Sequence, residues 1–186
     1  SAERTLKNII PFIEKKLFLK VNRKKTEVAH ISTVKYLGYS FYRHKGKCRF
    51  RVHPKSVAKM KNRIRELTDR NKGISNEVRE KKYQEYVRGW VEYFRLADMK
   101  KLLQKTDEWA RRRIRAVYWK QWKKIKTKCR MLKALGLEDW KAKELANSRK
   151  GYWRMAKVLN QIFSNKIIVK LGYTSMLDYY LVVYEN

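Results

Sequence analysis

Apolar side chains recur three or four positions apart over most of this chain, and this spacing predicts helices. Residues 19–53 are the exception, because their apolar residues alternate with polar ones in short runs typical of strands. The first 18 residues predict a helix that kinks or restarts at Pro11. Its apolar stripe consists of Leu6, Ile10, Ile13 and Leu17. We therefore expect a helix, then a strand-rich segment, then further helices.

The strand-rich segment is expected to contain a hairpin. Its candidate strands lie at residues 19–21, 28–31, 36–42 and 50–53. In the third strand, Leu37, Tyr39 and Phe41 share one face, because side chains alternate along a strand. Lys45 and Gly46 form the turn between the last two strands, since glycine permits the positive φ of tight hairpin turns.

Three long helices are predicted after this hairpin. The first starts at Pro54, where proline suits the first helical turn, and ends near Gly73. Ser75 starts the second helix. Asp98 caps the third, which reaches about Lys124. The three apolar stripes are Val57, Met60, Ile64 and Leu67, then Tyr83, Val87, Trp90 and Phe94, and then Met99, Leu103, Thr106, Ala110, Ile114 and Val117.

Shorter helices are predicted in the last third of the chain. They lie at residues 131–135, 140–146 after a cap at Asp139, 152–163, and in a short segment that ends at Leu171-Gly172. Ser175 and Asp178 have the spacing of a capping box, which starts the final helix. The predicted fold class is therefore mainly α (α+β): a small β-containing segment, a helical bundle and further short helices.

The balance of charge indicates a polyanionic partner. The 186 residues include 48 Lys and Arg against 17 Asp and Glu, a formal net charge of +31. Such a surplus opposes a compact fold unless a polyanion screens it, and Lys and Arg neutralise nucleic-acid phosphates. The densest basic stretch, residues 108–124, also carries three tryptophans. Because arginine and aromatic rings stack on unpaired bases, RNA or a single strand is favoured over duplex DNA.

Other protein classes fit the composition less well. With 44% hydrophobic and 13% aromatic residues, the chain can form a core, unlike a disordered basic tail. Cys48 and Cys129 form no disulfide framework, which fits a reducing intracellular compartment. No apolar run is long enough to cross a bilayer and no signal peptide is recognised, so no membrane partner is expected.

Motifs along nearly the whole chain resemble the C-terminal part of group II intron reverse transcriptases. In chain order they are residues 19–26 (LKVNRKKT), 36–41 (YLGYSF), 90–94 (WVEYF), 109–113 (WARRR), 119–123 (WKQWK), 149–154 (RKGYWR), 171–172 (LG) and 178–180 (DYY). The resemblance implies three regions. They are the end of the palm at residues 1–53, the thumb or maturase (domain X) helices at 54–126, and a C-terminal helical extension at 127–186.

The resemblance also implies a function. A protein of this family binds its intron RNA to assist splicing, and its thumb holds the template–primer during reverse transcription. The implied partners are group II intron RNA, an RNA template/DNA primer duplex, and the N-terminal fingers and palm of the same protein. The implied location is a bacterial cytoplasm or an organelle. The parent enzyme is an RNA-directed DNA polymerase that uses Mg²⁺ and dNTPs.

Catalytic and metal-binding residues are not expected in this chain. The family's YADD motif is missing from this sequence, and two-metal nucleotidyl transfer needs carboxylates clustered around ions about 3.5–4 Å apart. The aspartates instead are scattered, at Asp69, Asp98, Asp107, Asp139 and Asp178. The spacing of His44, Cys48, His53 and Cys129 matches no structural zinc pattern. We therefore assign this chain no cofactor.

Basic and aromatic side chains are the candidate RNA-binding residues. They are Arg111, Arg112, Arg115, Trp119, Trp122, Lys123, Lys124, Lys59, Arg63, Arg70, Lys81, Arg88, Arg95, Arg149 and Lys150. Helical spacing places Arg112, Arg115, Trp119 and Trp122 on one face, away from the apolar stripe of the third helix. The alternative is that the tryptophans belong to the core and the arginines are only solvated.

Tyr36, Leu37 and Gly38 are the candidate primer grip by resemblance. Glycine lets a nucleic-acid strand approach the backbone closely. The alternative is that Gly38 only relieves crowding in a twisted strand.

Two other functions stay open. The chain could be an unrelated basic RNA-binding protein, ribosome-associated or an RNA chaperone, without a polymerase context. It could also belong to an active polymerase, which requires further N-terminal sequence that carries the catalytic aspartates. Fingers and palm encoded directly upstream would exclude the unrelated RNA-binding protein.

Binding to intron RNA is expected to be strongly salt-dependent. Neutralising about 6–10 phosphates costs ~10³–10⁵ in affinity between about 50 and 200 mM salt. An RNA titration at several salt concentrations measures this, and an affinity that hardly changes would contradict a phosphate-dominated interface.

Overall fold

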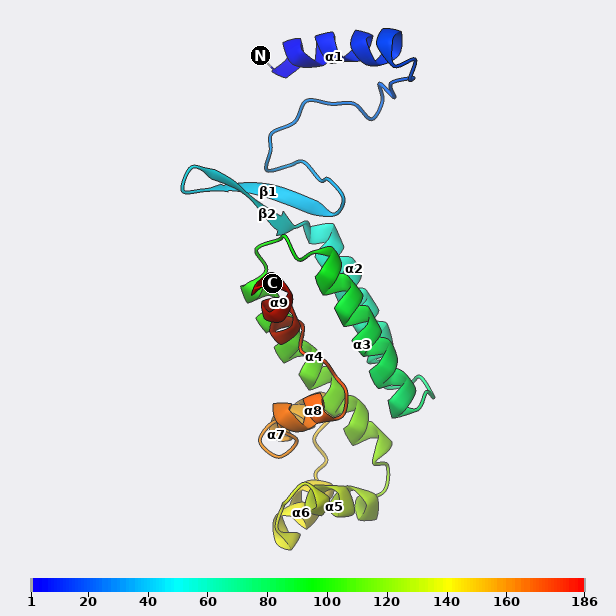
Figure 1. Cartoon of the computed structure of the whole chain (residues 1–186). Coiled ribbons are helices and arrows are strands. Elements are labelled where there is room, and N and C mark those ends of the chain that lie inside the picture. The colour runs from blue at the N-terminus through cyan, green and yellow to red at the C-terminus, as the bar shows by residue number, and fades with distance from the viewer. Residues whose placement is uncertain (1, 186) are drawn as a thin grey trace.

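A computed structural model describes residues 2–185, and helices dominate it (Figure 1). Within these residues the elements are α1 (Ala2–Lys16), β1 (Tyr39–His44), β2 (Lys47–Val52), α2 (Pro54–Leu67), α3 (Asn76–Tyr93), α4 (Lys100–Gln121), α5 (Ile125–Ala134), α6 (Asp139–Ala146), α7 (Tyr152–Val158), α8 (Asn165–Lys170) and α9 (Met176–Glu185). The single sheet of this part of the chain is the antiparallel pair β1–β2. The predicted fold class, mainly helical with a small β-containing segment, is confirmed.

The N-terminal helix α1 stands apart from the other elements (Figure 1). None of its residues is buried, and the helix continues past Pro11. The strands predicted at 19–21 and 28–31 are wrong, because these residues form turns and irregular chain. A strand needs a neighbour for its main-chain hydrogen bonds, and no other strand in residues 2–185 pairs with these segments.

The predicted hairpin is confirmed, although it starts later than expected. β1 begins only after a tight turn over residues 36–39, in which Leu37 and Gly38 both have positive φ. Lys45 and Gly46 also have positive φ, at 47° and 77°. Two consecutive residues with positive φ form a type I′ turn, whose backbone twist matches the right-handed twist of the two strands that it connects.

Helices α2, α3 and α4 bury the stripes predicted from their spacing. The buried members are Met60, Ile64, Leu67, Tyr83, Val87, Trp90, Phe94, Met99, Leu103, Thr106, Ala110, Ile114 and Val117. Ser75 starts α3 as predicted, because its Oγ accepts a hydrogen bond from the Val78 N–H (3.3 Å). The three-helix bundle is therefore a direct consequence of amphipathic spacing.

The predicted cap of α4 is wrong. Met99 holds the N-cap position and its side chain makes no capping hydrogen bond. Asp98 instead accepts a hydrogen bond from the Tyr42 hydroxyl (2.7 Å) and pairs with Arg49 (3.4 Å). Both partners lie on the hairpin, so this carboxylate fastens β1–β2 to the start of α4.

Helices α5 and α6 pack against each other below the bundle (Figure 1). The predicted cap at Asp139 is wrong, since Glu138 holds the N-cap position without a side-chain hydrogen bond. Asp139 instead pairs with Lys133 on α5 and with Lys143 one turn along α6. The helix predicted over residues 152–163 is also shorter, because α7 ends at Val158.

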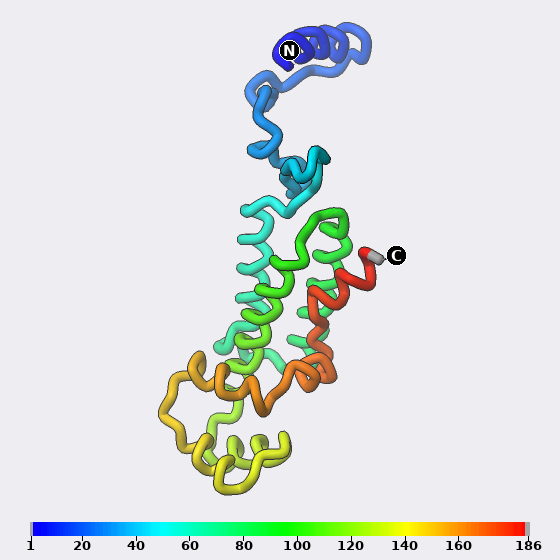
Figure 2. Tube along the Cα trace, turned by 90° about the vertical axis from the view of Figure 1, so that its left-hand side faces the viewer, coloured from blue at the N-terminus to red at the C-terminus, as the bar shows by residue number. Residues whose placement is uncertain are grey.

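Helix α4 is the centre of the molecule. Residues 114–119 are all buried, so at this level neighbours cover the helix on every side. α2, α7 and α9 pack against it, and Figure 2 shows the red α9 beside the green α4. Elements that precede and follow α4 in the sequence therefore share one core.

A buried carboxylate on α4 caps α9. Asp107, only 2% exposed, accepts hydrogen bonds from the Ser175 hydroxyl (2.9 Å) and from the main-chain N–H groups of Met176 and Leu177 (3.0 Å each). Burial raises the pKa of the Asp107 carboxyl, although these three donors oppose the rise. Ser175 also accepts from the Asp178 N–H (3.2 Å), which is half of the predicted capping box.

Asp107→Asn is expected to lower the free energy of unfolding by about 1–3 kcal/mol, because one amide oxygen cannot accept from three buried donors. The matched control is Glu144→Gln on the exposed side of α6, for which we expect a change within about ±0.5 kcal/mol. Urea denaturation measures both. Equal stability of the two variants would show that Asp107 does not hold α9.

Candidate nucleic-acid interface

The exposed face predicted on α4 is wrong. Arg115, Trp119 and Trp122 are only 3%, 2% and 7% exposed. The two indole rings pack edge to face, and Trp122 also contacts the ring of Phe163. The tryptophans therefore belong to the core, the alternative left open by their spacing. The cause is the chain after α6, which folds back over this side of α4 (Figure 2).

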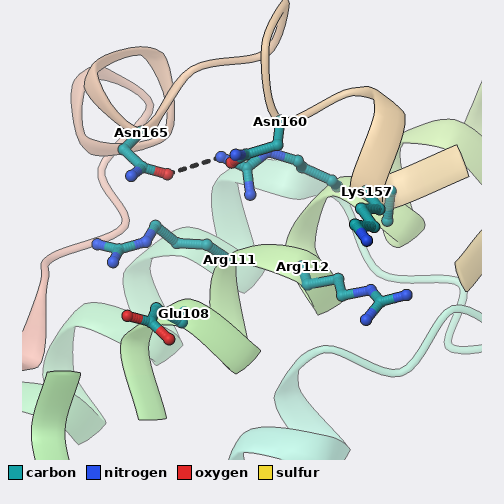
Figure 3. Close-up of a pocket in the computed structure, with 8 residues that line it drawn as sticks. Glu108, Arg111, Arg112, Lys157, Asn160 and Asn165 are labelled. Atoms are coloured by element: carbon teal, nitrogen blue, oxygen red, sulfur yellow. Dashed lines mark hydrogen bonds between the residues drawn. The ribbon is translucent and has the colours of Figure 1, made fainter. Parts of the chain in front are cut away.

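Arg115 holds that returning segment in place. Its Nε donates to the carbonyl oxygen of Phe163 (2.8 Å), and one terminal nitrogen donates to Asn165 Oδ1 (2.7 Å; dashed line in Figure 3). Burial, together with the positive charge of Arg111, lowers the pKa of the Arg115 guanidinium to about 10. Because both acceptors are neutral, the positive charge of Arg115 has no carboxylate to balance it.

Two neighbouring arginines also donate to main-chain carbonyls. Arg112 donates through two nitrogens to the carbonyl oxygen of Trp153 (3.2 and 3.0 Å). Arg113 donates to Thr68 Oγ1 (2.7 Å) and to the carbonyl oxygen of Arg65 (3.2 Å). The latter carbonyl lies in the last turn of α2, where helices have acceptors without a helical partner. These arginines are therefore not merely solvated.

Arginine and aromatic side chains gather where α2, α4 and α7 meet. We call this surface the arginine–aromatic ridge; its members are Arg65, Arg70, Trp109, Arg112, Arg113, Tyr152 and Trp153. Arg112 lies 4.0 Å from the centroid of the Trp153 ring, and Arg70 lies 5.0 Å from that of Tyr152. Each of these two aromatic residues is 42% exposed. The ridge thus offers both rings and guanidinium groups to a partner.

Two basic cavities, each of about 240 Å³, adjoin the Arg112–Trp153 stack, since Arg112 lines the first and Trp153 lines the second. The first, the α4–α7 pocket, is lined by four basic residues, Arg111, Arg112, Arg115 and Lys157, and by one acidic residue, Glu108 (Figure 3). The amides of Asn160 and Asn165 complete its polar lining.

The second cavity is lined by Arg70, Arg113 and Trp153, beside Thr68 and Asp69.

Ten of the candidate RNA-binding residues are exposed. They are Lys59, Arg63, Arg70, Lys81, Arg88, Arg95, Lys123, Lys124, Arg149 and Lys150. The structure brings Arg70 to the ridge, and Arg149 and Lys150 directly precede it in the chain. The others lie on α2, on α3, in the connection from α3 to α4 (Arg95) and in the link from α4 to α5, and none of them is among the ridge residues. Contact of any of them with RNA stays a prediction.

The candidate primer grip lies in the turn before β1. Tyr36 and Leu37 are 63% and 64% exposed. A Cβ on Gly38 would lie 3.0 Å from Ser56 Oγ and 3.1 Å from the Phe94 ring, and its φ is +83°. Packing and backbone conformation therefore account for this glycine, although it lies in a turn and not in the twisted strand of the alternative interpretation. The contact with a primer stays a prediction.

Several residues of the interface were missed by the sequence analysis. Trp109 and Trp153 lie in motifs that resemble the reverse transcriptase family. The tract RKGYWR combines basic with aromatic side chains, a pattern that indicates RNA binding. Lys157, Asn160 and Asn165 carry no such signal. They reach the pocket only because the chain after α6 returns to α4.

Within residues 2–185, no group of three or more His, Cys, Asp or Glu side chains is placed to hold a metal ion. No helix in that same part of the chain is long and apolar enough to cross a membrane.

Arg115→Gln is expected to destabilise the protein by about 1–3 kcal/mol, because it leaves a buried carbonyl oxygen without its donor. Arg130→Gln on the exposed side of α5 removes the same charge and should change stability by less than about 0.5 kcal/mol. Thermal melting of both variants tests this. A normal melting temperature for Arg115→Gln would mean that the residue is not a structural anchor.

Comparison with known proteins assigns part of the chain to a family. Residues 57–136 match the family described as group II intron, maturase-specific domain. No curated protein matches the chain. The matched region begins within α2, includes all of α3, α4 and α5, and ends at Gly136. The chain therefore carries a group II intron maturase-specific domain, the domain X or thumb of that family, over residues 57–136.

Proposed function

We propose that this protein binds group II intron RNA and assists its splicing through the arginine–aromatic ridge and the surrounding basic surface. The family assignment implies a maturase that binds intron RNA. The observation that carries the proposal for this chain is the ridge itself, where exposed rings stand beside guanidinium groups. That combination suits folded RNA with unpaired bases, because arginine binds phosphate while aromatic rings stack on bases.

The proposed contribution of the protein is positioning and charge neutralisation. Intron RNA must bring its own phosphates close together to fold, and their mutual repulsion opposes this. A chain with 31 more cations than carboxylates lowers that repulsion wherever it binds. The splicing chemistry then belongs to the RNA, while backbone contacts fix its register on the protein.

Holding a template–primer duplex is the second proposed role. The proposed divisions are the end of a palm at residues 1–53, thumb helices at 54–126 and a C-terminal extension at 127–186. An apolar cavity of about 180 Å³, lined by Leu37, Phe41 and Leu96 among others, lies where the proposed palm end meets the proposed thumb helices. In the described residues no group of three or more His, Cys, Asp or Glu side chains is placed to hold a metal ion. No polymerisation step is therefore assigned to them.

A general RNA chaperone is the alternative function, since the charge surplus alone would serve it. The maturase and the chaperone functions differ in their selectivity for RNA. A maturase prefers its folded intron over a scrambled RNA of equal length, whereas a chaperone binds both through phosphates alone.

Trp153→Ala is expected to weaken binding of intron RNA by about 1–3 kcal/mol, the value of one stacked base. The matched control is Trp140→Ala, which removes a 60% exposed indole from α6, outside the ridge. RNA titration at fixed salt, with thermal melting of the same samples, measures both effects. If Trp153→Ala binds like Trp140→Ala, or if wild-type protein binds scrambled RNA equally well, the proposal is wrong.

A further inference from the structure

We infer that the α4–α7 pocket binds a single phosphate group of the RNA backbone. This inference deepens the proposed function and rests on it, since it names the chemical group that one part of the interface takes. The residues that line this pocket come in equal number from the matched domain and from the C-terminal extension.

The charge of the pocket is the first argument. Arg111, Arg112, Arg115 and Lys157 line one cavity, and Glu108 is the single carboxylate in its lining. No ion pair among residues 2–185 engages any of these four cations. The pocket lining therefore has a net charge of +3, which an anion would balance.

The position of Arg115 is the second argument. This guanidinium lies at the floor, 3% exposed, and its two hydrogen bonds to Phe163 and Asn165 fix its orientation. A fixed guanidinium loses little side-chain entropy when an anion binds, which favours a defined site over a diffuse charged surface.

The neutral lining is the third argument. Asn165 accepts from Arg115 through its oxygen, so its amide nitrogen remains a donor. Asn160 lies opposite and is exposed at the rim with Lys157. A cavity of about 240 Å³ has room for about eight water molecules, which is ample for a phosphate group.

The surroundings of the pocket favour a nucleic acid over an acidic protein. Arg112 lines the pocket and also stacks on Trp153, which is 42% exposed. A phosphate in the pocket would therefore have an exposed ring next to it, where an adjoining base can stack. An acidic peptide has no base to stack on that ring.

The site is assembled from two distant parts of the chain. Three of its cations lie on α4, within residues 57–136, whereas Lys157 and both asparagines lie after that region. Arg115 joins the two parts, so the pocket exists only when the C-terminal extension is docked on α4.

The first test is a titration of the full chain with inorganic phosphate at constant ionic strength, with chloride as the compensating ion. The NMR signals of the Asn160 and Asn165 side-chain amides report binding. We expect saturable shifts in wild-type protein and a dissociation constant at least about tenfold higher in the Arg111→Gln/Lys157→Gln variant. Arg115 is left unchanged, because it is a structural anchor.

The control is Lys101→Gln/Lys105→Gln, which removes two charges from exposed positions on the same helix outside the pocket. It should bind phosphate as wild type does. An acetate titration is run in parallel. Phosphate binding that survives in the pocket variant, or acetate that binds as well as phosphate, overturns the inference.

The second test identifies the source of the phosphate. The slope of log affinity for intron RNA against log salt should become shallower by about 0.7–0.9 in the pocket variant, the loss of one phosphate contact. The same loss is expected whether or not the RNA carries a terminal phosphate. A loss that needs the terminal phosphate overturns the assignment to the backbone, and an unchanged slope overturns the site.

The two proposals fail differently. If wild-type protein prefers intron RNA but the pocket variant matches the control, the pocket inference is wrong and the proposed function stands. If wild-type protein binds phosphate in the pocket but does not prefer intron RNA, the proposed function is wrong and the anion site stands without RNA as its ligand.

Discussion

Hydrogen bonds from the arginines of α4 to main-chain carbonyls hold α2, α7 and the segment before α8 against this central helix. Arg112 binds the start of α7, Arg113 binds the end of α2, and Arg115 binds the segment before α8. Successive helical residues point about 100° apart, so Arg113 faces a different side from Arg112 and lies nearly opposite Arg115. One short basic run thus fixes segments on two sides of a single helix.

The choice of carbonyl acceptors follows from the composition. With 17 carboxylates for 48 cations, most arginines of this chain cannot find an acidic partner. A guanidinium can still be stabilised by neutral oxygens, at about 1.5–3 kcal/mol for a hydrogen bond that involves a charge. Such bonds leave the positive charge uncompensated. The arginines that assemble the fold therefore also create the field that attracts a polyanion.

Structure and binding are coupled for the same reason. Arg112 anchors α7 and forms part of the ridge, and Arg115 anchors the α7–α8 segment and forms the floor of the pocket. An anion bound there would balance charges that the folded chain keeps close together. Binding of RNA is accordingly expected to stabilise the docked C-terminal extension, since a ligand that binds only the folded state stabilises that state.

The sequence by itself determined the helical bundle, the hairpin and the charge. Each of these depends on local spacing or on composition: the stripe from Met60 to Leu67 is buried, and Gly46 turns the hairpin, because amphipathic period and backbone freedom act over a few residues. The recognisable tracts around Trp90 and Trp109 are likewise local, and they were enough to indicate the family.

Only the tertiary structure decided which face of α4 meets solvent. Helical spacing correctly grouped Arg112, Arg115 and Trp119, but it could not reveal that a segment some 40 residues later covers them. For the same reason Asp98 serves the hairpin instead of capping α4. Burial and hydrogen-bond partners depend on contacts distant in sequence, and a periodic pattern on one helix carries no information about them.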